Sequence, residues 1–428
     1  MKALLRTLFF ALLSSLFYLG TATAGGFDAH NLFSGKFTGI GGAAVSSATG
    51  SESVAFNPAG LASSHGWDLD LELAGGTVIR NMPVALGLPN ATSNKFVPIL
   101  GIFGAREISK GLGFGAGLFV AGGLGSEFGN QDFGANFTAL KPDFGGSTVL
   151  AELGVGLGYE IFPGLKIGGT WRPTFILINS KAAAVLPGNV LFAFQVNNAS
   201  KLTTSGFRFG AQYAPPDQSW GVGASVRTAI DFTANGTSSG SAELAGNSAI
   251  TPVTGGTFNI SSRFPVLASL GGHLDVSDDW KIFLEYEFIW TSQDKTFAGS
   301  GDPLVISGVG PIPAANLSIP LNWKNENTIR IGAQYSSSEK RVWRFGTVYS
   351  TPTTPENQAN SGFTAPGPEI SIDVGSGWKD VNVLGNPADL DLALDYTFNT
   401  GTAKNSISPS LDGKYSASDI ALFAGLHF

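Results

Sequence analysis

Apolar and polar residues alternate along many short stretches of this chain. Between Trp280 and Trp290 every second residue is apolar or aromatic, and Lys281, Glu285 and Glu287 lie between them. Side chains of a β-strand point alternately to its two faces, so this stretch is predicted to be a strand with one apolar and one charged face. A tilted strand needs ~9–11 residues to cross a bilayer, and Trp favours both membrane interfaces. The stretch therefore predicts a wall strand of a transmembrane β-barrel.

About fourteen segments of this kind recur, and an even number is typical of bacterial single-chain barrels. In each of them the charged residues share the face opposite the apolar one, as expected for lipid outside and a hydrated lumen inside. The segments start near residues 66, 96, 111, 148, 165, 201, 219, 257, 280, 323, 342, 369, 388 and 414. The predicted fold class is all-β, a membrane-spanning antiparallel up-and-down β-barrel of about fourteen strands.

The connections between these segments alternate in length. Short turns are predicted near residues 109–110, 163–164, 215–217, 277–279 and 337–339. Long loops are predicted near residues 81–95, 123–147, 182–200, 235–256, 298–322, 350–368 and 399–413. Outer-membrane barrels have short periplasmic turns and longer external loops, so both ends of the barrel are expected on the periplasmic side.

Three regions are predicted along the chain. Residues 1–24 have a basic start, an apolar stretch and Ala22-Thr23-Ala24, which is the pattern of a cleaved secretory signal peptide. Residues 25–65 are rich in Gly, Ala and Ser, lack sustained alternation and are too few to form a core of their own. We expect this second region to lie inside the lumen as a hatch. Residues 66–428 are predicted to form the barrel.

Composition narrows the function classes. The chain has 25 Lys and Arg against 32 Asp and Glu, a net charge of -7, and an acidic chain without a basic stripe argues against a nucleic-acid partner. It has no Cys, which excludes a disulfide framework and thiolate chemistry. Its 4 His lie outside recognisable catalytic or metal-binding motifs, so no metal and no cofactor are predicted. An outer-membrane lipase or protease remains an alternative, because catalytic triads are assembled in space.

The last predicted strand ends on an aromatic residue. Apolar residues occupy every second position behind Phe428. This ending resembles the signal that the outer-membrane assembly machinery reads, so that machinery is an expected partner through Phe428. Outer-membrane lipid and lipopolysaccharide are expected around the wall, and the predicted location is the outer membrane of a Gram-negative bacterium.

The predicted hatch contains a motif that points to a family. Residues 34–62 are rich in small residues and include Asn57-Pro58-Ala59-Gly60 shortly before the first predicted strand. The segment resembles the N-terminal hatch of the outer-membrane long-chain fatty-acid and aromatic-hydrocarbon transporters (FadL/TodX type, OMPP1). This resemblance implies a hatch motif at Asn57, Pro58, Ala59 and Gly60, a ligand groove among external loops, and a lateral exit at a kink in the third strand.

Two of the predicted external loops are unusually apolar. Residues 182–187 with 190–194, and residues 303–313, carry no charge. Exposed apolar surface indicates a ligand groove, and the candidate groove residues are Val185, Leu186, Leu191, Phe192, Phe194, Leu304, Val305 and Ile306. The alternative is that these residues pack on each other or extend a strand.

The third predicted strand has glycine at alternate positions, namely Gly111, Gly113, Gly115 and Gly117. Glycine permits bulges and bends and leaves no side chain to close a gap. Together with the family resemblance, this pattern implies the lateral gate on this strand. Close packing of the strand against the hatch is the alternative.

Several cations are predicted to face the lumen. Arg208, Arg227 and Arg330 are candidate partners for a fatty-acid carboxylate, because charge-assisted hydrogen bonds are strong where water is scarce. The alternative is that they pair with neighbouring carboxylates of the lumen.

These patterns together predict a monomeric outer-membrane transporter of hydrophobic small molecules. The expected ligand is a long-chain fatty acid, although an alkane or an aromatic hydrocarbon fits the same apolar groove. Passage is expected to be passive, through a plugged barrel with lateral exit. A general water-filled porin is the alternative class, and it accounts for the barrel and the polar lumen but not for the hatch or the apolar loops.

Conductance across a planar bilayer separates the transporter from the porin. We expect little ion current through the purified, inserted protein, because the hatch fills the lumen. A large and steady current would instead indicate an open porin.

Overall fold

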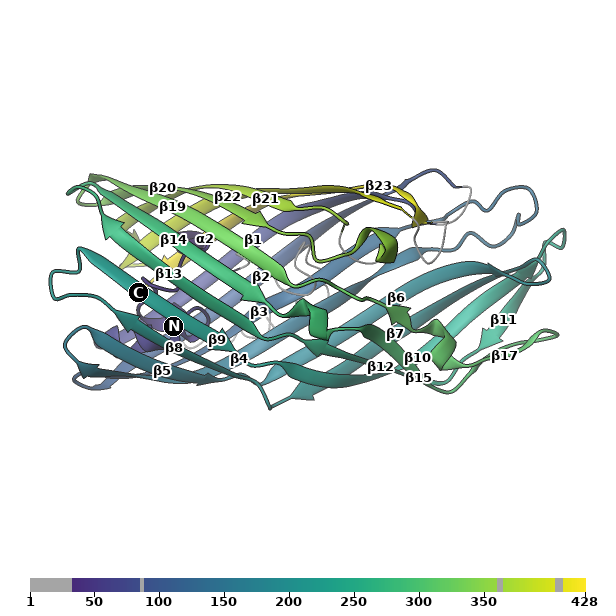
Figure 1. Cartoon of the computed structure of the whole chain (residues 1–428), viewed down its shortest axis with the longest axis horizontal. Coiled ribbons are helices and arrows are strands. Elements are labelled where there is room, and N and C mark those ends of the chain that lie inside the picture. The colour runs from purple at the N-terminus through teal and green to yellow at the C-terminus, as the bar shows by residue number, and fades with distance from the viewer. Residues whose placement is uncertain (1–32, 85–87, 360–364, 405–410) are drawn as a thin grey trace.

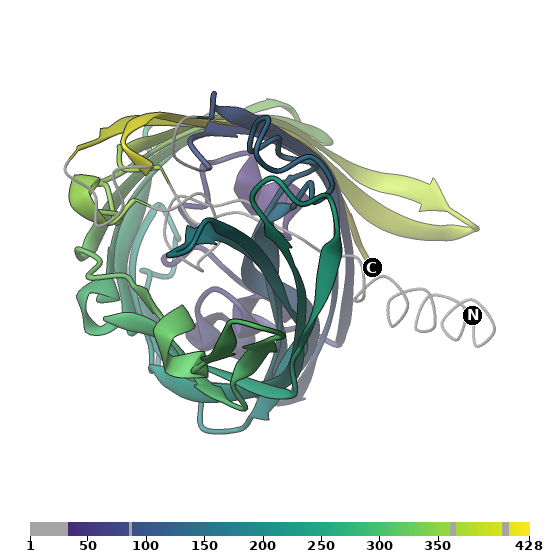
Figure 2. The ribbon, with the colours of Figure 1, turned by 90° about the vertical axis from the view of Figure 1, so that its right-hand side faces the viewer.

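The structure, a computed structural model, describes residues 33–84, 88–359, 365–404 and 411–428. The predicted signal peptide and the first residues of the predicted hatch lie outside these ranges. The described chain forms a closed antiparallel β-barrel, drawn from the side in Figure 1 and along its axis in Figure 2. No helix in the described ranges is both long and apolar enough to cross a membrane.

The strands, in chain order, are β1 Trp67–Met82, β2 Ala91–Ser109, β3 Leu112–Phe128, β4 Phe144–Phe162, β5 Leu165–Trp171, β6 Thr174–Leu186, β7 Val190–Thr203, β8 Phe207–Tyr213, β9 Trp220–Arg227, β10 Ile230–Leu244, β11 Ile250–Thr254, β12 Thr257–Phe264, β13 Leu267–Asp275, β14 Trp280–Ile289, β15 Thr296–Gly301, β16 Leu304–Ile306, β17 Gly310–Ile312, β18 Ile319–Pro320, β19 Glu326–Ser338, β20 Arg341–Ser350, β21 Glu369–Val383, β22 Asn386–Ala403 and β23 Gly413–His427. The short helices are α2 Gly35–Thr38, η1 Ser51–Val54, η2 Pro58–Ser63, η3 Thr291–Gln293, η4 Ala314–Leu317 and η5 Glu356–Gln358.

In the part of the chain that the structure describes, these elements join into 14 wall strands. Several wall strands are interrupted, so that the following elements succeed one another along the same strand: β5 and β6, β7 and β8, β9 and β10, β11 to β13, β14 to β16, and β17 to β19. The short turns gather at one end of the barrel, called here the turn end, and the opposite end is the loop end (Figure 1). The predicted strand number and antiparallel barrel are confirmed.

The alternation that predicted the wall is visible in the burial of its side chains. On β14, Ile282, Leu284 and Tyr286 are exposed on the outside, whereas Glu285 and Glu287 are buried on the inside. In a membrane the outward side chains contact lipid, so the large exposed apolar residues of this wall carry no cost.

The barrel closes between its first and last strands. β1 pairs with β23 from Asp70 opposite His427 to Asn81 opposite Ser416. At the turn end, Leu69 and Phe428 exchange two backbone hydrogen bonds of 2.9 and 3.2 Å. The terminal Phe428 is therefore part of the junction between the first and last strands. Its recognition by the outer-membrane assembly machinery stays a prediction.

The apolar stretches predicted as external loops are strands in the structure, which corrects that part of the prediction. Residues 182–186 lie in β6 and pair with β7 across a tight turn, and residues 304–306 form β16. The Val, Ile and Phe residues of these uncharged runs favour a pleated surface, and each new strand finds a neighbour to pair with. The barrel wall is therefore lengthened by β-hairpins at the loop end.

The interruption between β5 and β6 is held in place by a buried cluster of ion pairs. Pro173, between β5 and β6, has no N–H to donate, and the chain bends there. The neighbouring Arg172 donates two hydrogen bonds, of 2.8 and 2.6 Å, to Oε2 of Glu152. Arg208 donates to Oε1 of the same carboxylate at 3.1 Å, and both Glu152 and Arg172 are fully buried. Glu152 therefore joins two wall strands where backbone pairing is interrupted.

Replacing Glu152 should destabilise the barrel strongly. In Glu152→Ala the two arginines lose their shared partner inside the lumen, which costs about 3–5 kcal/mol for a buried pair. The exposed turn residue Glu339 provides the control, and Glu339→Ala should unfold like the unmodified protein. Urea unfolding in detergent micelles measures both, and equal midpoints for the two variants would contradict this role of Glu152.

Candidate functional site

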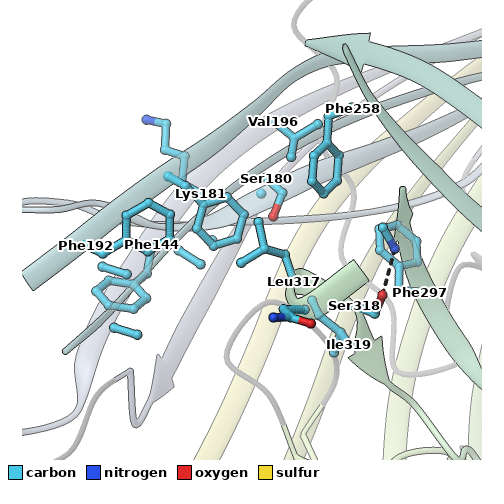
Figure 3. A pocket seen from close by; sticks show the side chains of 18 of the residues that line it. Phe144, Ser180, Lys181, Phe192, Val196, Phe258, Phe297, Leu317, Ser318 and Ile319 are labelled. Atoms are coloured by element: carbon cyan, nitrogen blue, oxygen red, sulfur yellow. Dashed lines mark hydrogen bonds between the residues drawn. The ribbon is translucent and has the colours of Figure 1, made fainter. Parts of the chain in front are cut away.

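A cavity of about 920 Å³ lies at the loop end of the barrel. Its lining comes from the start of β4, from β6 and β7, from β12 and β15, and from residues 311–319 (Figure 3). The walls of the cavity are therefore built by the lengthened hairpins together with the segment around η4.

The lining of this cavity is mostly apolar. Its aromatic residues are Phe133, Phe144, Phe192, Phe194, Phe258 and Phe297. Asn179, Ser180, Asn316 and Ser318 add a few uncharged polar groups. Among the described lining residues Lys181 alone is ionisable. A concave apolar lining with few polar groups is the usual form of a small-molecule site.

Lys181 is already paired with carboxylates. Its Nζ lies 3.1 Å from Oε1 of Glu127 and 3.0 Å from Oδ2 of Asp143. Burial opposes ionisation of Asp143, but the backbone N–H of Asn130 and the ammonium of Lys181 outweigh it, so the pKa of Asp143 is lowered. Lys181, the charged residue of the described lining, therefore has its charge balanced by two carboxylates.

Glu243 fixes the connection between β3 and β4 beside the cavity. Its buried carboxylate accepts backbone hydrogen bonds from Thr138 at 2.9 Å, Ala139 at 3.1 Å and Leu140 at 2.6 Å. Phe133 of the same connection contributes to the cavity lining. One side chain of β10 therefore holds a part of the cavity wall that has no strand partner of its own.

Beside the cavity, the ladder between β2 and β3 covers only part of the two strands. Their ladder runs from Ser109 opposite Leu112 to Gly101 opposite Phe119. Within the described ranges no ladder pair joins residues 91–100 of β2 to residues 120–128 of β3. β3 is also irregular here, because its register with β4 shifts between Val120 and Gly122. We call this stretch without β2–β3 ladder pairs the β2–β3 gap.

Side chains bound the β2–β3 gap at both ends. Towards the loop end, the backbone N–H of Glu127 donates to Oγ of Ser93 at 2.8 Å, and Lys95 lies 3.1 Å from the Glu127 carboxylate. Glu127 also pairs with Lys181 of the cavity. The carboxylate of Glu127 thus links the cavity lining to the loop-end side of the gap, called here its upper edge; the turn-end side is its lower edge.

Aromatic rings close the lower edge of the gap. Phe119 belongs to the last β2–β3 pair, and its ring centroid lies 5.2 Å from that of Phe103. Phe33, which precedes α2, lies 4.9 Å from Phe119 and 5.0 Å from Phe56. Two rings of the wall are therefore packed against two rings of the segment that precedes the barrel.

The segment preceding the barrel, residues 33–65, is called here the N-terminal segment. It contacts inward-facing side chains of the wall, for example through the N–H of Val45, which donates to Glu285 at 2.9 Å. Gly35 donates in the same way to Glu72 at 3.0 Å, and Gly41 accepts from Arg330 at 3.1 Å. The buried carboxylates and guanidinium groups of the lumen thus satisfy backbone groups of this segment.

Asn57 ties the N-terminal segment to two wall strands. Its fully buried amide Nδ2 lies 2.7 Å from the carbonyl of Val45, 3.1 Å from that of Ala211 and 3.2 Å from that of Ala224. Its Oδ1 accepts from the N–H of Ala59 at 3.2 Å and caps η2. An amide offers donors and an acceptor together, which explains the use of Asn here rather than Asp.

The wall strands carry glycine where η2 packs against them. A Cβ at Gly210 would overlap Oδ1 of Asn57, and one at Gly168 would overlap the backbone of Pro58. A Cβ at Gly158 would lie 2.7 Å from the carbonyl oxygen of Pro58. These three glycines, from β8, β5 and β4, are called the glycine seat. Only residues without a side chain let the turn at Asn57 approach the wall so closely.

The structure distributes the predicted groove residues over two environments. Val185, Leu186, Phe192 and Phe194 line the cavity, and Leu191 is buried opposite Val185 in the β6–β7 ladder. Leu304 and Ile306 are buried in the adjoining apolar core, and Val305 is exposed. The first hairpin therefore contributes directly to the cavity, and the second supports it from behind.

The glycines of the third strand lie on the turn-end side of the gap, where β3 is paired with β2, and not in the gap itself. Gly113 and Gly115 face Leu61 of η2, and a Cβ at Gly117 would overlap the ring of Phe103. Gly111 has a φ of 73° in the turn before β3. These contacts match the close-packing alternative, while the irregularity of β3 begins further along, after Val120.

The three candidate carboxylate-binding arginines lie outside the large cavity and pair with protein groups. Arg208 pairs with Glu152 and also donates to the carbonyl of Val54 at 2.9 Å. Arg330 pairs with Glu287 at 3.0 Å. Arg227 lies over the ring of Phe264 and donates to the carbonyl of Pro265 at 3.4 Å. They act structurally in this conformation, and binding of a ligand carboxylate stays a prediction.

Several residues of the site were not predicted from the sequence. Phe103 and Phe119 at the gap, and Phe258 and Phe297 in the cavity, point inwards from wall strands. For Phe103 and Phe119 the signal is a strand that is apolar on both faces, as in residues 96–103, because such a strand cannot face a hydrated lumen. The strands of Phe258 and Phe297 carry polar neighbours and lack this signal. Glu127 carries no such signal.

The sequence matches the family model described as outer membrane protein transport protein (OMPP1/FadL/TodX) over residues 15–424. The chain belongs to this family. The FadL/TodX assignment agrees with the closed barrel and makes the protein an outer-membrane transport protein for hydrophobic compounds. A comparison with curated proteins found no significant match.

Solved structures of the FadL/TodX type have the same fold. A FadL homologue of Pseudomonas aeruginosa is 15% identical with a TM-score of 0.75, over 94% of this chain and 99% of that one. The toluene transporter TodX of Pseudomonas putida is 17% identical with a TM-score of 0.71, over 96% and 99%. The toluene transporter TbuX of Ralstonia pickettii is 16% identical with a TM-score of 0.68, over 93% and 98%.

A methyl group at the glycine seat should loosen the N-terminal segment. Gly210→Ala forces its Cβ against Asn57, and such overpacking costs about 1–3 kcal/mol. Amides of residues 57–62 should then exchange with deuterium roughly ten-fold faster or more. Gly104→Ala is the matched control, since its Cβ would meet nothing nearer than 3.7 Å. Unchanged exchange in Gly210→Ala would show that the seat tolerates a side chain.

Proposed function

We propose that this barrel carries hydrophobic small molecules passively from the loop end, through the cavity, to the β2–β3 gap, and from there sideways out of the wall. The observation that carries the proposal is the position of a large apolar cavity beside the stretch of the wall where, in the described residues, no ladder pair joins β2 to β3. The loop end is the outward-facing end in this proposal, as the alternation of turns and loops predicts.

Apolar side chains continue from the cavity to the gap. Thr148 lines the cavity, and its neighbour Val149 packs in one cluster with Val120 of β3 and with Val97 and Ile99 of β2. A hydrophobic molecule loses contact with water in the cavity and stays in contact with apolar side chains along this cluster. Burial of its apolar surface is favourable by about 25 cal/mol per Å². Entry of the molecule into the cavity therefore needs no other energy source.

The N-terminal segment acts as the hatch in this proposal. Phe33 and Phe56 pack on the wall rings at the lower edge of the gap, and Asn57 fixes the turn that follows. A molecule that reaches the gap displaces Phe33 from Phe119 before it leaves. The hatch motif Asn57-Pro58-Ala59-Gly60 supplies the fixed point from which this part of the segment moves.

The chemistry of the cavity favours an uncharged ligand over the fatty-acid carboxylate expected from the sequence. A carboxylate would have to compete with Glu127 and Asp143 for Lys181. An uncharged hydrocarbon leaves that ion pair intact and contacts the phenylalanines of the lining. Two of the structural relatives are toluene transporters, which supports the same choice.

Competition between two radiolabelled ligands tests this function. We expect purified protein to bind toluene more tightly than oleate, and Ser180→Trp, which fills the cavity, to weaken toluene binding at least ten-fold, about 1.4 kcal/mol. Ser336→Trp at the turn end of β19 is the control and should bind as the unmodified protein does.

Two outcomes would contradict the proposal. Equal toluene binding by Ser180→Trp and Ser336→Trp would place the ligand outside the cavity. Tighter binding of oleate than of toluene would leave the transport route standing but overturn the choice of an uncharged ligand.

A further inference from the structure

Three metal-binding side chains from distant parts of the sequence meet near the turn end of the lumen. Glu52 lies in η1 of the N-terminal segment, Glu72 in β1 and His427 in β23. One oxygen of each glutamate and one ring nitrogen of the histidine lie within 4.8 Å of one another. This trio joins the N-terminal segment to the two strands that close the barrel.

The two glutamate oxygens of this trio lack hydrogen-bond partners. Oε1 of Glu52 and Oε1 of Glu72 are buried without one, and Nε2 of His427 faces the carboxylates of Glu72 and Asp391. Both glutamates are only 2% exposed. Buried carboxylate oxygens that accept no hydrogen bond cost free energy, so a fold that retains two of them beside one imidazole calls for an additional partner.

The imidazole is oriented as in known metal sites. Nδ1 of His427 lies 2.6 Å from Oδ1 of Asp70, and in the tautomer that carries the proton on Nδ1 this carboxylate accepts it and Nε2 offers its lone pair to a metal. A carboxylate that holds the second nitrogen of a metal-binding histidine is the usual outer contact of such sites. Asp70 is itself held by the hydroxyl of Ser51, next to Glu52.

A fourth oxygen lies within reach. Oδ2 of Asp391 is 3.1 Å from Nε2 of His427, and Oε1 of Glu72 is 3.8 Å from it. Two ligands of one tetrahedral zinc ion, each about 2.1 Å from the metal, are roughly 3.4 Å apart. Small rotations of the side chains therefore bring this set to the spacing of a metal site. The other oxygen of Asp391 pairs with Arg344, so Asp391 is the weakest of the four donors.

We propose that Glu52, Glu72 and His427 bind a divalent transition-metal ion of the zinc class, with Asp391 or water as the fourth ligand. Carboxylate together with imidazole suits zinc, whereas calcium and magnesium take oxygen ligands in larger number. The bound ion cross-links the N-terminal segment to β1 and β23. This inference goes beyond the transport function, because it concerns how the segment is held rather than what passes.

The sequence conceals this site, and no metal was predicted from it. The three ligands stand at positions 52, 72 and 427, with none of the short spacings by which zinc motifs are recognised. Only closure of the barrel brings the last strand beside the first, and only the packing of η1 adds the third ligand.

Calorimetric titration of the full-length, EDTA-treated protein in detergent with zinc chloride tests the site. We expect one zinc ion per chain, and at least ten-fold weaker binding in Glu52→Gln and in His427→Gln. Asp70→Asn, which removes only the outer contact, should weaken binding about 10–100-fold. His273→Gln is the matched control, because His273 also faces the N-terminal segment, through Ser46, but lies outside the trio. It should bind zinc as the unmodified protein does.

A second measurement on the unmodified protein decides the question if a variant does not fold. Zinc should slow hydrogen exchange of the amides of residues 51–55 at least ten-fold, because Glu52 becomes fixed. Absence of zinc binding, binding that Glu52→Gln retains in full, or binding without this protection would each overturn the proposal.

Discussion

Hydrocarbon cannot hydrogen-bond to a backbone, and this constraint shapes the whole molecule. Every wall strand must pair on both sides, so the sheet closes, β1 pairs with β23, and even the last residue, Phe428, exchanges hydrogen bonds with Leu69. Closure creates a lumen that must be filled or hydrated. Where wall strands are interrupted, buried groups such as Glu152 replace the missing pairing, and the N-terminal segment occupies the space inside.

The β2–β3 gap is the place where this constraint is relaxed. Within the described ranges no ladder pair joins residues 91–100 of β2 to residues 120–128 of β3. Apolar side chains line this stretch, and Glu127 pairs with Lys181 of the cavity at its loop-end side. The cavity, the β2–β3 gap and the N-terminal segment are therefore in contact with one another, through Glu127 on one side of the gap and Phe119 on the other. The glycine seat sets how closely the turn at Asn57 approaches the wall.

Local patterns in the sequence were sufficient for the wall and insufficient for the site. Alternation around Trp280 depends on neighbours two residues apart, and it predicted strands, faces and the antiparallel barrel correctly. The predicted apolar loops became hairpins because pairing with neighbours, which a local pattern does not contain, stabilises them as strands. The contacts of Asn57 with Ala211 and Ala224 join residues 154 and 167 positions apart, and the meeting of Glu52 with His427 spans most of the chain, so they follow only from the folded barrel.

An engineered disulfide between positions 54 and 154 tests most directly whether the N-terminal segment must move. The chain has no Cys, so Val54→Cys with Gly154→Cys adds a single pair. A Cβ at Gly154 would touch the side chain of Val54, which places the two sulfurs within bonding reach. With the disulfide closed, uptake of the hydrophobic ligand into proteoliposomes should stop, and a reducing agent should restore it, while the Val54→Cys variant transports at the same rate with and without the reducing agent. Uptake at the normal rate with the disulfide closed would contradict the account.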